Sequence, residues 1–177
     1  GDVCNNGTCA GTANTALCED SNSCTTDSCA GTTGQSALSF DGVDDRVAFG
    51  PASTHTELSL PRFTVEAWFK KTGPGVQATV ASGTTAIPIV TKGRGLGDNG
   101  DMDINYTLAI TGANKLIGTF EDTVGTDAVV LGTTTLVDGT WYHGAVSFDG
   151  STLRLYLNGV QETSLATALV PALDPVA

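Results

Sequence analysis

Residues 138–159 read DGTWYHGAVSFDGSTLRLYLNG, and this stretch decides the fold. Two runs rich in apolar and aromatic residues, 141–148 and 152–157, are separated by Asp149-Gly150, and Asn158-Gly159 follows the second run. Asp-Gly and Asn-Gly favour two-residue hairpin turns, because such turns need positive φ angles. The stretch therefore predicts an antiparallel hairpin that leads into a second tight turn.

Strand-like patterns continue on both sides of this hairpin. Residues 63–70 alternate, so that Phe, Val, Ala and Phe share one face of a strand and Thr, Glu, Trp and Lys share the other. Further strands are expected at 37–40, 46–49, 87–92, 106–111 and 115–121. Helical periodicity is absent from the sequence, and many short strands joined by turns predict an all-β sandwich or barrel.

The composition restricts the possible partners. The chain has 177 residues, a formal net charge of −11 and a pI near 4.2. Nucleic acids and anionic membranes are disfavoured, because both need clustered Lys and Arg. Divalent cations are natural partners of such a chain, although an acidic surface can also serve solubility alone. Residues 72–91, the longest uncharged stretch, contain Gly and Pro and are rich in Thr, so they do not predict a membrane span.

The N-terminal segment, residues 1–35, has neither basic nor aromatic residues, so only cross-links could give it a fixed shape. All five cysteines lie in it: Cys4, Cys9, Cys18, Cys24 and Cys29. They predict at least two disulfides with one cysteine left over, in fifteen possible patterns, and hence a secreted protein. Metal binding is the alternative, but C-x-x-C spacing is missing. We therefore expect a disulfide-stapled segment over 1–35 and a β-sandwich over 36–177.

The second region resembles the laminin-G-like, concanavalin-type jelly rolls. The resemblance is carried by ALSFDGVDDRV at 37–47, FTVEAWFK at 63–70, IVTKG at 89–93 with NYTL at 105–108, and the 138–159 stretch. It implies a two-sheet antiparallel jelly-roll sandwich. Such domains usually add closing strands after the Asn-Gly turn, whereas this chain ends with a Pro-containing tail at 170–177. The closing strands are therefore expected to be missing.

The N-terminal segment resembles the C-x-D-x-N-x-C-T-x-D-x-C units that large bacterial surface proteins carry in tandem. Residues 18–29 match one unit, and residues 1–11 match the second half of a preceding one. The expectation is that the sequence is a piece of a longer surface protein.

Two acidic clusters could bind calcium, which prefers hard oxygen ligands. The first contains Asp98, Asn99, Asp101 and Asp103, and the second contains Asp41, Asp44 and Asp45. A solvated loop is the alternative for the first cluster, and a simple turn for the second. Calcium is therefore a possible cofactor.

Catalytic residues are not expected. The E-x-D-x-E run of concanavalin-like glucanases is missing, Glu66 stands alone on its strand, and Glu121 and Asp122 should face opposite ways. His143 is expected to be a packed structural residue. Trp68 and Trp141 could stack on sugar rings, but their place in family core motifs favours burial. Asn6 and Asn105 begin glycosylation sequons, which we expect to carry no glycan in a bacterial protein.

These features predict an extracellular, non-enzymatic adhesion or assembly module of a cell-surface protein. One alternative is a structural subunit of an extracellular filament, completed by strand exchange or disulfides. Another is a lectin-like carbohydrate-binding module. The expected partners are other copies of the chain or an extracellular glycan or protein.

Overall fold

A computed structural model describes residues 3–5, 8–10, 37–49, 56–81, 83–93 and 104–173. Its internal contacts divide the chain into two units, residues 1–48 and 49–177, which are considered separately. Asp98, Asn99, Asp101, Asp103, Cys18, Cys24 and Cys29 lie outside the described residues.

The first unit contains a short antiparallel hairpin of β1 (Val3–Asn5) and β2 (Thr8–Ala10). Its register places the Cα atoms of Cys4 and Cys9 opposite each other. Opposed Cα atoms in antiparallel pairs are about 4.5–5.5 Å apart, within the range that a disulfide spans. The disulfides expected in this segment stay predictions.

Residues 37–49 form no strand, so the strands expected at 37–40 and 46–49 are wrong. Their apolar side chains are exposed, for example Leu38 at 59% and Phe49 at 76%. Alternating apolar and polar residues suit a β-strand, but a strand forms only where a neighbouring strand can pair with its backbone N–H and C=O groups.

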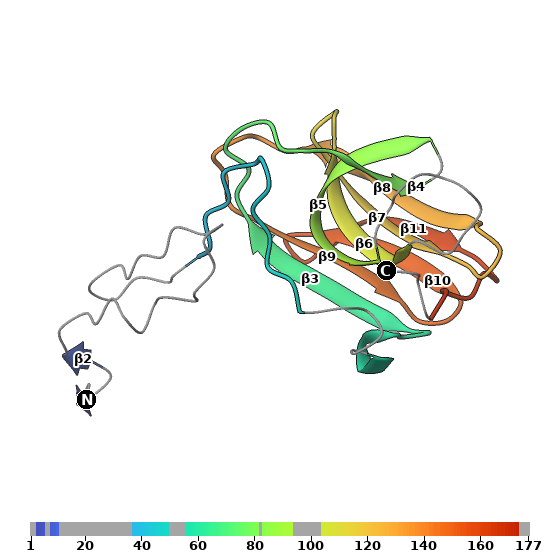
Figure 1. The fold of residues 1–177 in the computed structure, drawn as a ribbon, viewed down its shortest axis with the longest axis horizontal. Helices are drawn as coiled ribbons and strands as arrows, with labels where there is room; N and C mark the ends of the chain where they lie inside the picture. Colours follow the sequence, from blue (N-terminus) through green and yellow to red (C-terminus); the bar gives the residue numbers. More distant parts are fainter. Residues whose placement is uncertain are drawn as a thin grey trace. The chain divides into compact units, whose positions relative to one another are not determined.

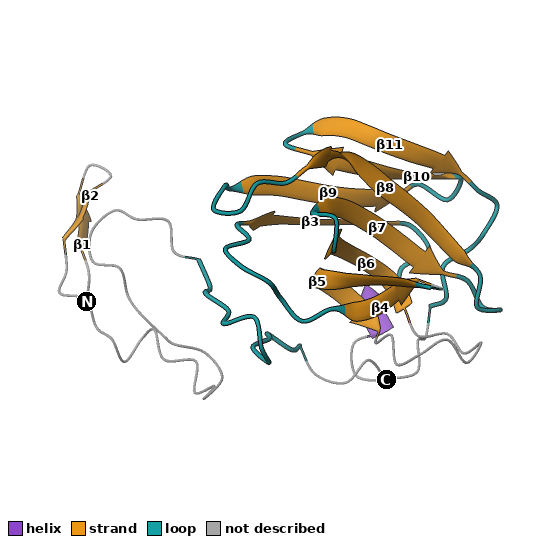
Figure 2. Ribbon diagram, turned by 90° about the horizontal axis from the view of Figure 1, so that it is seen from above, coloured by secondary structure: helices purple, strands orange, loops and turns teal. Residues whose placement is uncertain are grey.

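The second unit is a sandwich of two curved antiparallel sheets, as Figures 1 and 2 show. One sheet has the order β11-β10-β9-β3, and the other has the order β4-β5-β6-β7-β8. The strands are β3 (Phe63–Phe69), β4 (Ala78–Ala81), β5 (Thr84–Gly93), β6 (Ile104–Thr111), β7 (Lys115–Glu121), β8 (Asp127–Thr135), β9 (Tyr142–Phe148), β10 (Thr152–Leu157) and β11 (Val160–Ala166). The short 3-10 helix η3 (Thr56–Leu58) precedes β3. The fold class predicted from the sequence is confirmed.

The core lies between the two sheets. Phe63 of β3, Phe120 of β7 and Phe148 of β9 are each at most 5% exposed, and their rings pack together with centroids 4.6–6.2 Å apart. The alternation predicted for residues 63–70 is confirmed, because Phe63, Val65 and Phe69 belong to this core and Thr64, Glu66 and Trp68 point outward.

The two turns of the 138–159 stretch differ. Asn158 and Gly159 have φ angles of 51° and 79°, which fits the expected two-residue turn. Asp149-Gly150 instead belongs to a longer loop, because Phe148 pairs with Leu153 and only Gly150 has a positive φ. The Asp149 carboxylate accepts hydrogen bonds from the backbone N–H groups of Ser151 and Thr152, and these bonds hold the longer loop.

A strand, β11, follows the Asn158-Gly159 turn, so the expectation that the sandwich stops there is partly wrong. Beyond β11 the described tail forms no further strand, and its strand-like pairing is an isolated antiparallel bridge between Pro171 and Asp122. This agrees with the view that a tail containing proline is a poor strand.

Candidate functional site

The outer face of the five-stranded sheet is covered where β4 and the described tail lie against it, whereas Leu131 on β8 is 48% exposed. Val80 of β4 packs against Ala86, Ala109 and Ile117, and the Thr119 hydroxyl donates a hydrogen bond to the Val80 carbonyl at 2.8 Å. At the other end of this face, the Asn105 side-chain amide donates to the Ala172 carbonyl. We call this side of the sheet the covered face. Its packing contacts and hydrogen bonds stabilise the fold.

The covered face includes the Asn105 sequon. Asn105 has no exposed surface and its Nδ2 already donates to the chain tail. A glycosyltransferase therefore cannot reach this nitrogen in the folded protein. Asn6, the other sequon asparagine, lies outside the described residues.

The outer face of the four-stranded sheet is different, because large side chains on it are exposed or, in the case of His143, half-buried. We define the open face by five outward side chains of β3, β9 and their adjoining residues: Glu66, Trp68, Lys70, Trp141 and His143. The register pairs Trp68 with His143, and their ring centroids are 5.3 Å apart. The His143 Nε2 atom lies 3.6 Å from a carboxylate oxygen of Glu66.

Both tryptophans belong to the open face. Trp68 is 69% exposed and Trp141 is 47% exposed, so the expectation that they are buried is wrong. Lys70 lies 5.5 Å above the Trp141 ring, a cation–π geometry. The strand alternation already assigned Trp68 to the outer side of its strand, but the resemblance to core motifs outweighed that signal.

Small residues of β9 continue the same outer surface beyond the open face. Ala145 and Ser147 are flanked by Glu66 and Thr64 on β3 and by Tyr156 and Arg154 on β10. Tyr156 is half-buried. The sheet therefore presents aromatic rings beside hydrogen-bonding groups, an arrangement suited to ligands that carry both apolar faces and hydroxyls.

The hairpin end of this sheet carries an ion pair. Arg154 donates to the Asp149 carboxylate at 2.6 Å. This hydrogen bond, together with those from Ser151 and Thr152, holds the pKa of Asp149 well below its usual range. The pair restrains the β9–β10 loop.

The carboxylates considered for catalysis lie apart. Glu66 is on the open face, whereas Glu121 is buried on the other sheet, where it accepts a hydrogen bond from the Ile104 N–H at 3.3 Å. The two therefore belong to different sheets and are not brought together.

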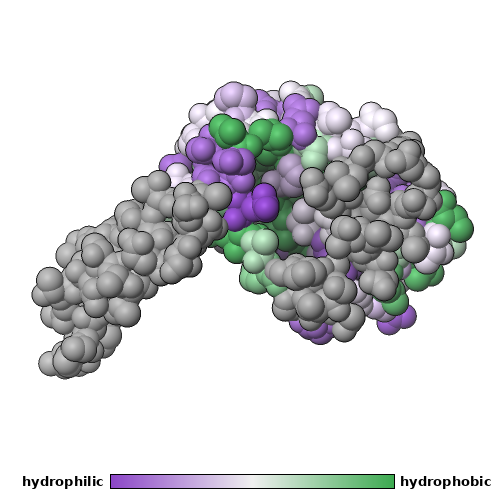
Figure 3. Space-filling view, in the orientation of Figure 1, coloured by the Kyte–Doolittle hydropathy of each residue, from purple (hydrophilic) through white to green (hydrophobic). Residues whose placement is uncertain are grey.

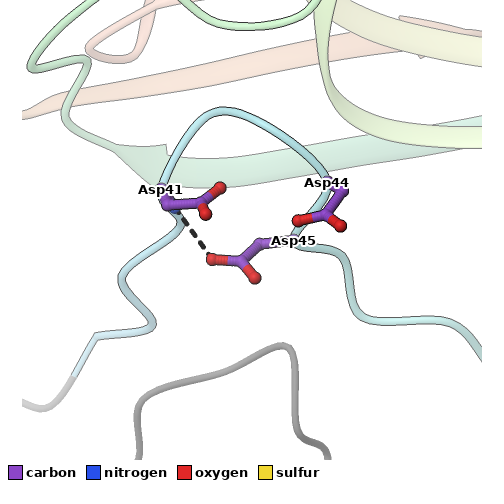
Figure 4. A group of neighbouring side chains, drawn as sticks. All are labelled: Asp41, Asp44 and Asp45. Atoms are coloured by element: carbon purple, nitrogen blue, oxygen red, sulfur yellow. Dashed lines mark hydrogen bonds between the residues drawn. The ribbon is translucent and has the colours of Figure 1, made fainter.

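Asp41, Asp44 and Asp45 come together in a loop of the first unit, as Figure 4 shows. One carboxylate oxygen from each lies within 4.8 Å of the others. Asp41 accepts from the Val43 N–H, and Asp45 accepts from the Asp41 N–H at 2.8 Å. Three oxygen donors at this spacing could hold part of a calcium shell, which needs six to eight oxygens. Calcium binding here remains a prediction.

The described surface on the side drawn in Figure 3 is a mosaic. Figure 3 shows small apolar patches in green among polar residues in purple and white on the side drawn there. In the described residues, no helix has the length and apolar character needed to cross a membrane.

Comparison with known proteins places this chain in a family. Residues 41–175 match the laminin-G-like model of the concanavalin A-like lectin/glucanases superfamily. Because the match covers most of the chain, the protein belongs to this superfamily. Curated proteins gave no match.

Two solved structures are similar in fold. They are the CBM40 module of the Ruminococcus gnavus IT-sialidase bound to α2,3-sialyllactose and the same module bound to α2,6-sialyllactose. Sequence identities are 18% and 19%, TM-scores are 0.47 and 0.46, and 70% of this chain is covered. The chain spans 62% and 63% of their lengths, and likeness of this degree says nothing about its ligand.

Proposed function

We propose that this protein is a secreted, non-enzymatic adhesion module that binds glycans in the manner of a lectin through its open face. The observation that supports the proposal is the exposure of Trp68, 69% on a regular strand, beside the side chains of His143 and Glu66. Isolated exposed apolar residues need no explanation. Two exposed indole rings on one sheet face are a different matter, because Trp is enriched at binding hot spots.

The chemistry of the open face suits sugars. An indole ring offers a flat apolar surface for the C–H faces of a sugar ring, while Glu66 accepts hydrogen bonds from hydroxyls and His143 offers ring nitrogens. Glu66 and Trp68 lie two residues apart on the same side of β3. A sugar stacked on Trp68 could therefore have its hydroxyls within reach of Glu66.

A non-enzymatic role is supported by the surroundings of the acidic groups. Glycoside hydrolysis commonly uses two carboxylates that flank the scissile bond. In the described part of the open face and its borders, Glu66 faces His143, Asp138 pairs with Lys71 at 2.8 Å, and Asp149 pairs with Arg154. Asp138 and Asp149 are thus held by basic side chains, and Glu66 lies beside an imidazole rather than beside a second acid.

The proposal is tested by screening the full chain against a panel of extracellular polysaccharides and oligosaccharides. For any glycan that binds, Trp68→Ala should weaken the affinity by about tenfold or more, as truncation of a hot-spot residue does. The matched control is Leu131→Ala, which removes a 48% exposed apolar side chain from β8 in the other sheet and should leave binding unchanged. Binding that Trp68→Ala leaves intact, or no binding across the panel, would contradict the proposal.

A further inference from the structure

Short side chains follow one another along β9 on the outer side of the four-stranded sheet. Val146 and Phe148 of this strand belong to the core, so alternation turns Ala145 and Ser147 outward. Ala145 is nevertheless only 7% exposed. A methyl group on an outer face is shielded to this degree because longer side chains stand on both sides of it. We call the outer side of β9 at Ala145 and Ser147 the β9 strip.

The strand register sets the borders of the β9 strip. On one side its two residues pair with Glu66 and Thr64 of β3, and on the other side they pair with Tyr156 and Arg154 of β10. Side chains on one face repeat about every 6.8 Å along a strand, whereas the neighbouring strand is about 4.8 Å away. An extended ligand can therefore follow the short side chains along β9, because the long side chains of β10 obstruct a path across the sheet.

Aromatic rings of the open face lie at one end of the β9 strip. Trp68 pairs with His143, two residues before Ala145. From His143 to Ser147 the outer side covers 147 − 143 = 4 residue steps, or about 14 Å, and Trp141 extends it beyond the start of β9. This length is greater than that of one sugar ring, so a single sugar would contact only part of it.

The charges around the β9 strip favour an uncharged ligand. Glu66, whose side chain is 62% exposed, borders its middle. The basic side chains nearby have partners within the fold, because Arg154 donates to Asp149 at 2.6 Å and Lys70 lies 5.5 Å above the Trp141 ring. The whole chain carries −11. A carboxylate or sulfate on a glycan would therefore meet charge of its own sign.

From these observations we propose that the open face and the β9 strip together bind an internal stretch of a linear, uncharged polysaccharide, which lies lengthwise along β9. The inference rests on the proposed glycan-binding function and names the class of glycan. One sugar ring stacks on Trp68, and the hydroxyls of the sugars that follow meet Glu66 and Ser147. Because the contacts are spread along the strand, the affinity grows with the number of sugars bound.

Oligosaccharides of increasing length test the proposal on the unmodified chain. The probes are gluco-, xylo-, manno- and galacto-oligosaccharides of two to six sugars, with oligogalacturonides of the same lengths as acidic counterparts. In isothermal titration calorimetry, at least one uncharged series should bind with an affinity that rises by about tenfold or more from the shortest probe to the longest. The oligogalacturonides should bind more weakly than that series at every length.

A matched pair of variants tests the path along β9. Ser147→Ile places a stiff, branched side chain without a hydroxyl on the β9 strip, so most of the gain in affinity with probe length should disappear. Ser164→Ile makes the same exchange at an exposed position of β11, two strands away from β9, and should keep the full gain. Circular dichroism checks the fold of both variants, and the length series of the unmodified chain is independent of either.

The outcomes separate this proposal from the one on which it rests. Equal affinity for short and long probes overturns it but leaves the glycan-binding function intact, and so does tighter binding of the oligogalacturonides. A Ser147→Ile variant that keeps the full gain with length has the same consequence. Absence of binding to every probe also overturns it, and the glycan-binding function is contradicted as well only if the wider polysaccharide panel gives no binding.

Discussion

The outer faces of the two sheets are both built by alternating strands, but one face is buried where β4 and the described tail cover it and the other is exposed to solvent. On the covered face, β4 and the described tail seal residues such as Ile117 and Asn105 from water. On the open face, Trp68 and Trp141 stand in solvent. Apolar and polar groups occur on both, so composition alone does not distinguish them. Residues of the covered face contribute to the stability of the fold, whereas residues of the open face are accessible to a ligand.

The largest expected effect contrasts one truncation on each face. Ile117→Ala should lower the free energy of unfolding by about 2–5 kcal/mol, because it leaves a cavity beneath β4. Trp68→Ala should lower it by less than about 1 kcal/mol, since an exposed side chain loses little packing. Urea unfolding of both variants measures the contrast. Equal losses would show that Trp68 is packed and that the two faces are alike.

Calcium provides a test outside both faces. If Asp41, Asp44 and Asp45 hold the ion, calcium at a hundredfold excess over its Kd should stabilise the folded state by about 2.7 kcal/mol. The melting temperature should fall on chelation, while glycan binding by the open face should persist. Alanine replacement of all three aspartates should remove the response to chelator. Melting curves that are identical with and without chelator would remove calcium from the account.

A smaller effect tests how β4 is held on the covered face. Thr119→Val keeps the shape of the side chain but leaves the Val80 carbonyl without its donor, which should cost about 1–3 kcal/mol. Thr64→Val is the matched control, because Thr64 is exposed on the other sheet and should be nearly neutral. Hydrogen exchange should show faster exchange of the β4 amides in Thr119→Val only. Unchanged β4 protection would mean that this bond does not hold the strand.

The smallest effect concerns Asp149 at the hairpin end of the four-stranded sheet. The pKa of the Asp149 carboxyl is lowered in the folded state. The ionised carboxylate therefore stabilises the folded protein at pH values above its ordinary pKa of 3.8, and this stabilisation is lost as the pH falls toward the pKa of the folded state. Asp149→Asn should therefore melt slightly below wild type at neutral pH, and the gap should narrow below about pH 4. Since Asp149 is exposed, the shift should be small. A gap that widens with acid would contradict a lowered pKa of Asp149 in the folded state.

Much of the sandwich could be predicted from the sequence, since alternation and turn residues are local signals. Residues 63–70 and 152–157 both form strands as expected, and the first has the faces predicted for it. β4 was missed because four small residues carry too little pattern, and β8 because its run is rich in Thr and Gly. The strands predicted within residues 37–49 were wrong for the opposite reason. Their alternation of apolar and polar residues is clear, but alternation does not guarantee that a neighbouring strand is there to pair with them.

The candidate site was harder to predict for a physical reason. Alternation places Trp68 on the outer side of its strand, but exposure depends on whether another element covers that side. On the five-stranded sheet β4 and the tail supply such a cover, and neither is visible in the local sequence around Asn105 or Ile117. Coverage is a property of chain topology, so the same alternating pattern yields a buried face in one sheet and an open one in the other.

The most direct test of the open face is acrylamide quenching of tryptophan fluorescence, because the chain has only two tryptophans and both lie there. In the Trp141→Phe variant of this chain, emission reports on Trp68 alone. The account predicts that quenching of the folded variant approaches that of the same chain in urea, and that a bound glycan reduces it. Strong protection of Trp68 in the folded protein without any ligand would contradict the account.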